Sequence, residues 1–311
     1  MTIIMQNTRG GVRLATPATD EGLIMNFMPR IRLGIAAVST LAFVAYAASA
    51  QTSKEEPAMS DYKQQVVELL KSIETGDRKP IAYINPNKYI QHNLAVGDGL
   101  AGLAVLFQSL PKGSAKVNTV RVFQDGNFVF AHTEYNFFGP KVGFDIFRFE
   151  DGMIVEHWDN LQETAAKASP SGHTMLDGPT VAADLEQTAA NKALMQAYMD
   201  DLLSGRRDKF PGYFDGNNYI QHNPWVADNL TGLIAGLQGL AKQGLAVKYN
   251  RVHNVLAEGN FVLVVSEGTF GDALTAYYDL YRIQNAKIAE HWDTLEAIPP
   301  RADWKNSNGK F

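Results

Sequence analysis

One pentapeptide occurs twice in this chain, and the same tetrapeptide follows each copy at nearly the same distance. The sequence YIQHN fills residues 89–93 and 219–223, and EHWD fills residues 156–159 and 290–293. Two uncommon motifs repeated in one order and at nearly one spacing indicate an internal duplication. The motifs also hold four of the seven histidines. We therefore expect the chain to fold as two copies of one domain.

The two copies also agree outside the motifs. Identical residues stand at matching places in the pairs Val96/Val226, Asp98/Asp228, Leu100/Leu230, Gly102/Gly232, Leu103/Leu233, Asp145/Asp279, Arg148/Arg282 and Ile154/Ile288. The stretch between the copies is rich in Ala, Ser, Pro and Gly, which is typical of a domain boundary. We predict a first domain over residues 59–163, a linker over 164–183 and a second domain over 184–311.

Residues 1–50 carry the pattern of an export signal. Arg30 and Arg32 precede an apolar run that ends in the small-residue sequence Ala-Ser-Ala at Ala50. A basic region, an apolar region and such a site, in this order, indicate a signal peptide. A membrane anchor is the alternative, since the run approaches spanning length, but its many Ala, Ser and Thr residues favour cleavage. We expect cleavage after Ala50, a periplasmic or secreted protein, and no stable membrane anchor after cleavage.

Charge and cysteine content exclude several classes of function. The formal net charge is -5 and the sequence pI is about 5.8. No segment concentrates Lys and Arg, so we expect no nucleic-acid partner. The sequence contains no cysteine, which excludes disulfides, thiolate catalysis and cysteine-ligated zinc.

Each copy is expected to begin with helices and to end with strands. Helical periodicity predicts helices over residues 61–74, 98–110, 185–203 and 228–240, with Asp98 and Asp228 as N-caps. Alternating apolar residues between turn signals predict strands over residues 116–124, 128–137, 143–150, 153–161, 246–256, 261–270, 276–283 and 287–295. This order is α+β. We predict two tandem cone-shaped α+β barrels, in each of which a curved antiparallel sheet wraps over helices around a pocket.

The EHWD motifs supply the first candidate site residues. Side chains alternate across a strand, so His157 and Asp159 share one face, as do His291 and Asp293. A histidine and a carboxylate placed in this way can act as an acid/base pair. We predict that both pairs are catalytic and line the pockets.

The YIQHN motifs supply a second set. Tyr89 and Gln91 share one face and are predicted to bind the ligand, as are Tyr219 and Gln221. His92 and His222 are predicted to be catalytic and to approach the EHWD pairs. Alternation puts them on the opposite face from these Tyr and Gln residues, so this prediction requires a bulge in the strand.

Another strand supplies a third set. His132 and Glu134 share a face, Glu267 matches Glu134, and all three are predicted to bind the substrate. Polar networks that only tie strands and turns together can look like sites, so a structural role is the alternative for each of these residues. For Asp145 and Arg148, which lie on opposite faces of their strand, the structural interpretation is preferred.

Several stretches of the chain resemble the SnoaL-like branch of the nuclear-transport-factor-two-like superfamily. They are the YIQHN motif, the glycine-containing helix after it, DIFR at residues 145–148 and IVEHWD at residues 154–159. The resemblance is strongest to the SnoaL-like aldol-condensation and polyketide-cyclase group, and it covers residues 61–162 and 186–311. It implies the cone fold. That fold hosts cyclases, isomerases, dehydratases, epoxide hydrolases and non-enzymes, so it does not select a reaction. Members usually have Pro after the QHN triplet; Pro224 keeps it and Leu94 does not.

The expected function is binding of a small apolar or carbonyl-containing molecule, with cofactor-independent acid/base catalysis such as aldol cyclisation, isomerisation or dehydration. Burial in an apolar cone raises the pKa of a carboxylate, which suits it to take a proton beside a carbonyl. A non-catalytic ligand-binding protein is the alternative, favoured by the signal peptide. A third option is a structural pair in which one cone only supports the other.

We expect no cofactor and no metal. His92, His132, His157 and Glu134 are numerous enough to hold zinc, but the sequence lacks HxH and HxxxH spacings. We expect the two copies to pack through their sheets as an intramolecular pseudo-dimer, with a homodimer of the whole chain as a further option.

Overall fold

The structure is a computed structural model and describes residues 61–110 and 113–311, which belong to one compact unit, Glu56–Phe311. The predicted signal peptide and its cleavage site lie outside the described residues. Within the described residues, no helix has both the length and the apolar character needed to cross a membrane.

The first repeat combines helices with a five-stranded sheet. Its elements are α1 (Asp61–Thr75), the 3-10 helix η1 (Lys79–Tyr83), β1 (Ile90–Gln91), α2 (Gly99–Ser109), β2 (Lys116–Asp125), β3 (Phe128–Asn136), β4 (Pro140–Glu150) and β5 (Met153–Glu163). The strand order is β1-β5-β4-β3-β2. β1 runs parallel to β5, and the remaining neighbours are antiparallel.

The second repeat has the same topology, with strand order β6-β10-β9-β8-β7. Its elements are η2 (Leu185–Gln187), α3 (Thr188–Leu203), η3 (Arg207–Lys209), α4 (Phe210–Tyr213), η4 (Gly216–Asn218), β6 (Ile220–Gln221), α5 (Asn229–Lys242), β7 (Val247–Glu258), β8 (Phe261–Phe270), β9 (Ala273–Gln284) and β10 (Lys287–Ala297), followed by η5 (Arg301–Asp303). The predicted α+β class is confirmed in both repeats.

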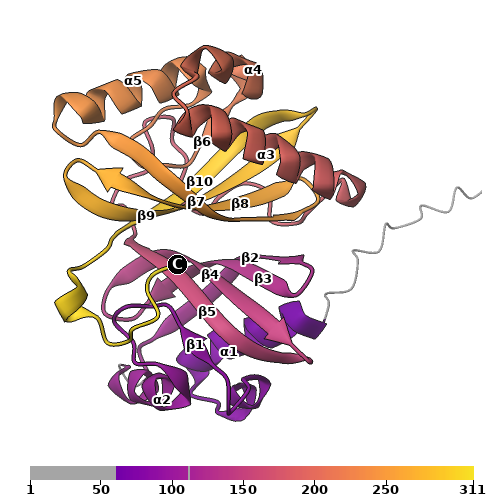
Figure 1. Cartoon of the computed structure of the whole chain (residues 1–311), viewed down its shortest axis with the longest axis vertical. Helices are drawn as coiled ribbons and strands as arrows, with labels where there is room; N and C mark the ends of the chain where they lie inside the picture. Colours follow the sequence, from indigo (N-terminus) through magenta and orange to yellow (C-terminus); the bar gives the residue numbers. More distant parts are fainter. Residues whose placement is uncertain (1–60, 111–112) are drawn as a thin grey trace, which may run out of the picture. The chain divides into compact units, whose positions relative to one another are not determined.

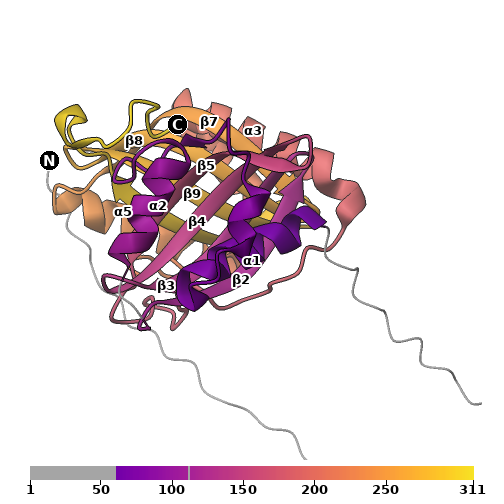
Figure 2. The same cartoon turned by 90° about the horizontal axis from the view of Figure 1, so that it is seen from below.

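One face of each sheet, here called the inner face, is covered by the helices of its own repeat (Figures 1 and 2). On the first inner face, Val129, Ala131 and Tyr135 of β3 pack with Leu69 and Leu70 of α1 in one buried cluster. The apolar stripe of α1 and the period of two along β3 thus bury each other, as the sequence pattern requires.

The other face of each sheet, here called the interface face, packs against the sheet of the other repeat. A single buried cluster contains Phe130 and Phe144 from the first sheet with Leu263 and Tyr278 from the second. Because both faces of both sheets are covered, the central strands carry long buried runs instead of a strict apolar and polar alternation.

The predicted N-caps have a different role from the one expected. Asp98 stands at the N-cap position of α2, but its carboxylate makes no capping hydrogen bond. Its Oδ1 instead accepts the backbone N–H of Gln91 at 3.0 Å, and Asp228 Oδ1 accepts that of Gln221 at 2.9 Å. These aspartates fix the YIQHN strands relative to the helices that follow them.

Candidate active site

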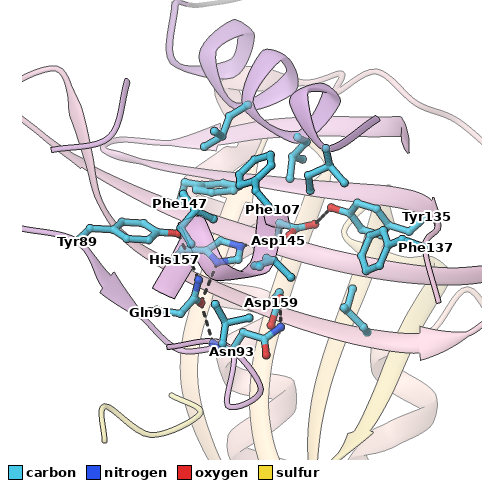
Figure 3. Close-up of a pocket in the computed structure, with 17 residues that line it drawn as sticks. Tyr89, Gln91, Asn93, Phe107, Tyr135, Phe137, Asp145, Phe147, His157 and Asp159 are labelled. Carbon is cyan, nitrogen blue, oxygen red and sulfur yellow. Dashed lines mark hydrogen bonds and ion pairs between the residues drawn. The ribbon is translucent and has the colours of Figure 1, made fainter. Parts of the chain in front are cut away.

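A cavity of about 90 Å³ lies between helices α1 and α2 and the inner face of the first sheet (Figure 3). Most of its wall is apolar and is made by Leu69, Leu70, Ile73, Val96, Leu103, Leu106, Phe107, Phe137, Phe147 and Leu161. Its polar wall residues are Tyr89, Gln91, Asn93, Tyr135, Asp145, His157 and Asp159. An apolar pocket with a few convergent polar groups is the usual form of a small-molecule site.

His157 is held at both ring nitrogens. Nδ1 lies 3.0 Å from Gln91 Oε1, and Nε2 lies 3.2 Å from Asp145 Oδ1. The Gln91 amide is itself oriented, because its Nε2 donates to the Tyr89 hydroxyl at 3.3 Å and its Oε1 accepts the Asn93 backbone N–H at 2.8 Å. Both ring nitrogens therefore have an oxygen partner, and the two contacts fix the orientation of the imidazole ring.

Asp145 has a second donor on the same face. The Tyr135 hydroxyl donates to Asp145 Oδ2 at 2.6 Å. Burial raises the pKa of Tyr135 well above its ordinary value, and the Asp145 carboxylate raises it further. The phenol therefore stays protonated and serves Asp145 as a fixed donor.

Asp159 keeps one carboxylate oxygen free of hydrogen bonds. Asn93 Nδ2 donates to its Oδ2 at 2.6 Å, whereas its Oδ1 is buried with no hydrogen-bond partner. The residue is 6 % exposed, and it lines the cavity with His157 and Asp145. Lys310 Nζ lies 3.8 Å from this oxygen. Buried polar atoms are nearly always hydrogen-bonded, so a carboxylate oxygen without a hydrogen bond at an apolar cavity is a candidate proton acceptor.

The second repeat contains the same network. His291 Nδ1 lies 2.9 Å from Gln221 Oε1, and its Nε2 lies 3.0 Å from Asp279 Oδ1. Asn223 Nδ2 donates to Asp293 Oδ2 at 2.7 Å, and Asp293 Oδ1 is again buried without a hydrogen-bond partner. The structure thus brings the predicted His and Asp together on the inner face in both repeats.

Burial perturbs the ionisable groups of the second network. It raises the pKa of Asp293 to about 6, against the lowering effect of His291. For His291, burial opposes the charged form, but the hydrogen bond to Asp279 and the charges of Asp293 and Asp279 raise the pKa overall. Perturbed carboxylates and histidines of this kind are common in functional sites, although structural networks produce them too.

The two inner faces differ in their tyrosines. The strand registers place Tyr281 where the first repeat has Phe147, Tyr277 where it has Gly143, and Tyr249 where it has Val117. At Gly143, an added Cβ would lie 2.3 Å from a Leu161 side-chain carbon. The second inner face is therefore richer in phenol rings than the wall of the first cavity.

One of these tyrosines preserves a hydrogen bond from a different strand. Tyr249 of β7 donates to the Asp279 carboxylate, with its hydroxyl 3.1 and 3.2 Å from the two oxygens. Tyr135 of β3 serves Asp145 in the first repeat, and the matching position of β8 is Gly268. In the second repeat the phenol therefore comes from β7 and not from β8, but it makes the same contact with the aspartate. A buried carboxylate requires such a hydrogen-bond partner.

The prediction that His92 and His222 approach the EHWD pairs is wrong. His92 Nε2 lies 2.9 Å from Glu156 Oε1, and the ring stacks on Trp158 at 4.8 Å. His222 Nε2 lies 2.8 Å from Glu290 Oε1 on the same side of the second sheet. Alternation along the strand holds, so these histidines point away from the inner face.

Three further residues that were predicted to bind the substrate, on strands β3 and β8, also lie outside the cavity. His132 is buried against Phe144, with its Nδ1 3.1 Å from Arg121 Nη1. Glu134 is exposed and accepts Asn118 Nδ2 at 3.3 Å, and Glu267 accepts His253 Nε2 at 3.2 Å. All lie on the interface face, because β3 and β8 turn their alternate residues toward the other sheet.

Sequence reasoning missed Asp145, Asp279, Asn93 and Tyr135 as site residues. Asp145 was assigned a structural role, yet it bonds His157 at the cavity wall. The available signal was the identity of Asp145 and Asp279 between the two copies, together with their place on the strand before EHWD. Asn93 was also available, since it shares a strand face with Gln91.

Three groups in the described residues have ligand atoms close enough to hold a metal ion. They are Asp145/His157/Asp159, Asp279/His291/Asp293 and His173/Asp177/His222, with the atoms of each group within 4.8 Å of one another. In the third group, His222 Nδ1 also lies 2.8 Å from the Thr174 carbonyl oxygen. That nitrogen therefore acts as a donor to the backbone and is not free as a ligand.

No protein-family model and no curated protein matches the chain. Similar solved structures, each matching about a third of this chain, include proteins described as a putative polyketide cyclase, a putative ketosteroid isomerase and an NTF2-like protein. TsrD from Streptomyces laurentii is 19% identical, with a TM-score of 0.29, and the match covers 34% of this chain and 92% of TsrD. An NTF2-like protein from Cytophaga hutchinsonii is 14% identical, with coverages of 34% and 95% and a TM-score of 0.29. An LEH-like epoxide hydrolase from M. tuberculosis is 17% identical, with coverages of 32% and 81% and a TM-score of 0.28.

Proposed function

We propose that the first repeat binds a small, largely apolar carbonyl compound and removes a proton next to the carbonyl without a cofactor. The observation that carries this proposal is the buried Oδ1 of Asp159, which has no hydrogen-bond partner and lies in the wall of an apolar cavity with His157. Aldol cyclisation, isomerisation and dehydration can each proceed through such a proton abstraction. An apolar wall around the base also strengthens every charge interaction made inside it.

Each polar residue of the cavity has a role in this proposal. Asp159 Oδ1 takes the proton from the carbon next to the carbonyl, while Asn93 holds Oδ2 in place. The Tyr89 hydroxyl accepts from Gln91, and no acceptor for its own hydrogen is found among the described residues. That hydrogen can stabilise the enolate oxygen.

Hydrogen–deuterium exchange tests this step without knowledge of the natural substrate. A panel of small cyclic and acyclic ketones would be incubated with the protein in deuterated buffer, and loss of the α-proton signal followed by NMR. We expect exchange above the buffer rate for at least one ketone, lost in Asp159→Asn and reduced in Tyr89→Phe. Glu134→Gln, on the interface face, is the matched control and should leave the exchange rate unchanged.

Ligand binding without turnover is the second candidate. It is favoured by the saturation of His157 and Asp145, because both His157 nitrogens and both Asp145 oxygens already have partners. A saturated polar network rigidifies a pocket and needs no reaction to explain it. Ketones that bind saturably but exchange only at the buffer rate would establish this function and exclude the catalytic one.

We also propose that the mature protein acts outside the cytoplasm. The support is the order of basic residues, apolar run and Ala-Ser-Ala sequence before Gln51. Expression of the whole chain followed by fractionation and N-terminal sequencing should give a periplasmic or secreted protein that begins at Gln51. An uncleaved chain retained with the cytoplasm would exclude export.

A further inference from the structure

The second inner face has two phenol rings at a place where the first has one. In the first repeat, Tyr135 covers Gly143, since a Cβ added to that glycine would lie 3.4 Å from the Tyr135 ring. In the second repeat, Tyr277 takes the place of Gly143 in the strand register and stacks on Tyr249, with the ring centroids 4.8 Å apart. The second repeat therefore carries an additional ring beside its network.

Hydrogen bonds fix both of these rings. Tyr277 is 1 % exposed, and its hydroxyl donates to the Thr269 carbonyl at 2.7 Å. The Tyr249 hydroxyl is held by the Asp279 carboxylate, as described above. Because a buried hydrogen bond is costly to leave unmade, neither ring can swing aside to admit a ligand without losing a partner.

A further ring comes from helix α3. Tyr198 stands seven residues before Gly205, the glycine after this helix, and Leu69 stands seven residues before Gly76, the glycine after α1. Leu69 lines the first cavity. Tyr198 is also buried, and its ring contacts that of Tyr281 edge-on at 6.1 Å. A larger side chain thus stands where the first repeat has a cavity wall.

The phenols of the second inner face gather around one carboxylate. They are Tyr198, Tyr249, Tyr277 and Tyr281. Burial raises the pKa of each phenol, and the charge of Asp279 raises it further. A charge shifts a pKa mainly from nearby, so the phenols surround the carboxylate that bonds to His291. The matching carboxylate of the first repeat, Asp145, lies in the cavity wall.

We propose that Tyr198 and Tyr277 are specificity-determining residues that close the second repeat to the apolar ligand of the first. Protein interiors are packed at nearly constant density, so volume added by these rings is volume taken from a cavity. The chain then holds one apolar ligand, in the first repeat, although both repeats carry the His and Asp network. That this ligand is a carbonyl compound rests on the proposed function; its exclusion from the second repeat does not.

Xenon tests the inference, because it is apolar and unreactive and enters dry cavities in proteins. Crystals of the protein would be placed under xenon pressure and the xenon atoms located. In wild type we expect xenon in the first cavity and none beside Asp279. Tyr198→Leu/Tyr277→Ala should add a second xenon beside Asp279, and Leu69→Tyr should remove the xenon from the first cavity.

Tyr198→Phe/Tyr277→Phe is the matched control, because it keeps both rings and removes only the hydroxyls. It should leave the second repeat without xenon. Xenon beside Asp279 in wild type or in this control would overturn the inference. So would the lack of a second xenon in folded Tyr198→Leu/Tyr277→Ala, or undiminished xenon in the first cavity of Leu69→Tyr.

The remaining outcomes separate this inference from the proposed catalysis. If Tyr198→Leu/Tyr277→Ala does not fold, Leu69→Tyr and the Phe control decide the inference. The expected xenon pattern together with no ketone exchange in wild type would reject the catalysis and leave the exclusion standing. A wild-type protein with no xenon in either repeat would overturn the inference and the apolar site together.

Discussion

Asn160 and Thr294 occupy matching positions in the two repeats and hydrogen-bond to each other across the two sheets. Asn160 Nδ2 donates to the Thr294 carbonyl at 2.8 Å and to its Oγ1 at 3.1 Å, and Thr294 Oγ1 lies 3.3 Å from the Asn160 carbonyl. Both residues are fully buried. They directly follow Asp159 and Asp293, so each strand turns one residue to a site and the next to the other repeat.

This contact predicts that the two repeats stabilise each other. Asn160→Ala should lower the free energy of unfolding by about 1–3 kcal/mol, because it leaves buried carbonyl groups of the second repeat without a donor. Urea unfolding followed by far-UV circular dichroism measures the change. Asn118→Ala is the control, since Asn118 is exposed, and its effect should stay within about 0.5 kcal/mol. Equal stabilities for the two variants would show that the contact adds nothing to the packed interface.

Tyr135→Phe tests the phenol that serves Asp145. It removes the 2.6 Å hydrogen bond to the carboxylate while the ring remains. The loss should destabilise the protein by about 1.5–3 kcal/mol, the usual worth of a hydrogen bond to a charged group. Tyr62→Phe is the control, because Tyr62 contributes a ring stacked on Phe149. A thermal unfolding temperature that is the same in Tyr135→Phe and wild type would contradict the prediction.

The raised pKa of Asp293 predicts that the stability of the protein depends on pH. Burial raises the pKa of this carboxyl from 3.8 to about 6, so the folded state favours the protonated form. The corresponding stabilisation is complete below the unfolded value and is lost as the pH rises through about 6. Asp293→Asn should therefore gain roughly 1–3 kcal/mol relative to wild type at about pH 8, and much less at about pH 4.

Denaturant unfolding at the two pH values checks this prediction. His291 loses stabilisation in the same direction, because its pKa is raised as well, and this contribution is smaller in Asp293→Asn because the Asp293 charge is one cause of the raised pKa. A difference between Asp293→Asn and wild type that does not grow with pH would show that burial is not the dominant influence on this carboxyl.

The contacts of Arg121 predict that its substitution will make the linker between the repeats more accessible to a protease. Its guanidinium is buried, donates to the backbone carbonyls of Leu176, Asp177 and Pro179, and lies 4.4 Å from the Trp292 ring. Arg121→Met leaves these carbonyls without their donor, so we expect the free energy of unfolding to fall by about 1–3 kcal/mol. Limited proteolysis should then cut within residues 164–183 faster than in wild type. Arg251→Met, at an exposed position of β7, should leave the cleavage rate unchanged.

The fold could be predicted from sequence because its determinants are local and repeated. The motif duplication and the period of two along the strands correctly placed His157 and Asp159 on the face that lines the cavity. Alternation also placed His92 on the other face, and the prediction that it reaches the site failed because no bulge reverses the strand there. Asp145 was missed because its approach to His157 depends on the pairing of β4 with β5, and register between strands cannot be derived from either strand alone.

The tyrosines that bond to Asp145 and Asp279 show the same limit of prediction from sequence. Tyr135 and Tyr249 serve equivalent aspartates from neighbouring strands, so aligning the two repeats hides the equivalence. A contact between distant segments such as Lys310 and Asp159 leaves no pattern in the local sequence either. Local periodicity thus predicts which face a residue takes, whereas the chemistry at that face is completed by residues that only tertiary structure brings together.

We predict that Asp159→Asn and Asp293→Asn have unequal effects on proton exchange, because the two repeats have unequal roles. Both carboxylates have a buried Oδ1 without a hydrogen bond, but of the two only Asp159 lines the apolar cavity described above and lies near Lys310. Asn keeps an acceptor oxygen for the neighbouring Asn93 or Asn223 amide, so the network should survive while the base is lost. We expect α-proton exchange of a bound ketone to fall by about 10²–10⁴-fold in Asp159→Asn and to change little in Asp293→Asn.

Ketone affinity, measured by calorimetry on the same proteins, separates binding from catalysis. Retained affinity with lost exchange in Asp159→Asn is the expected result, because the apolar wall is untouched and only the proton acceptor is removed. An equal loss of exchange in the two single variants would show that both repeats work. An unchanged rate in the double variant would exclude both aspartates as the base and leave the cavity as a binding site.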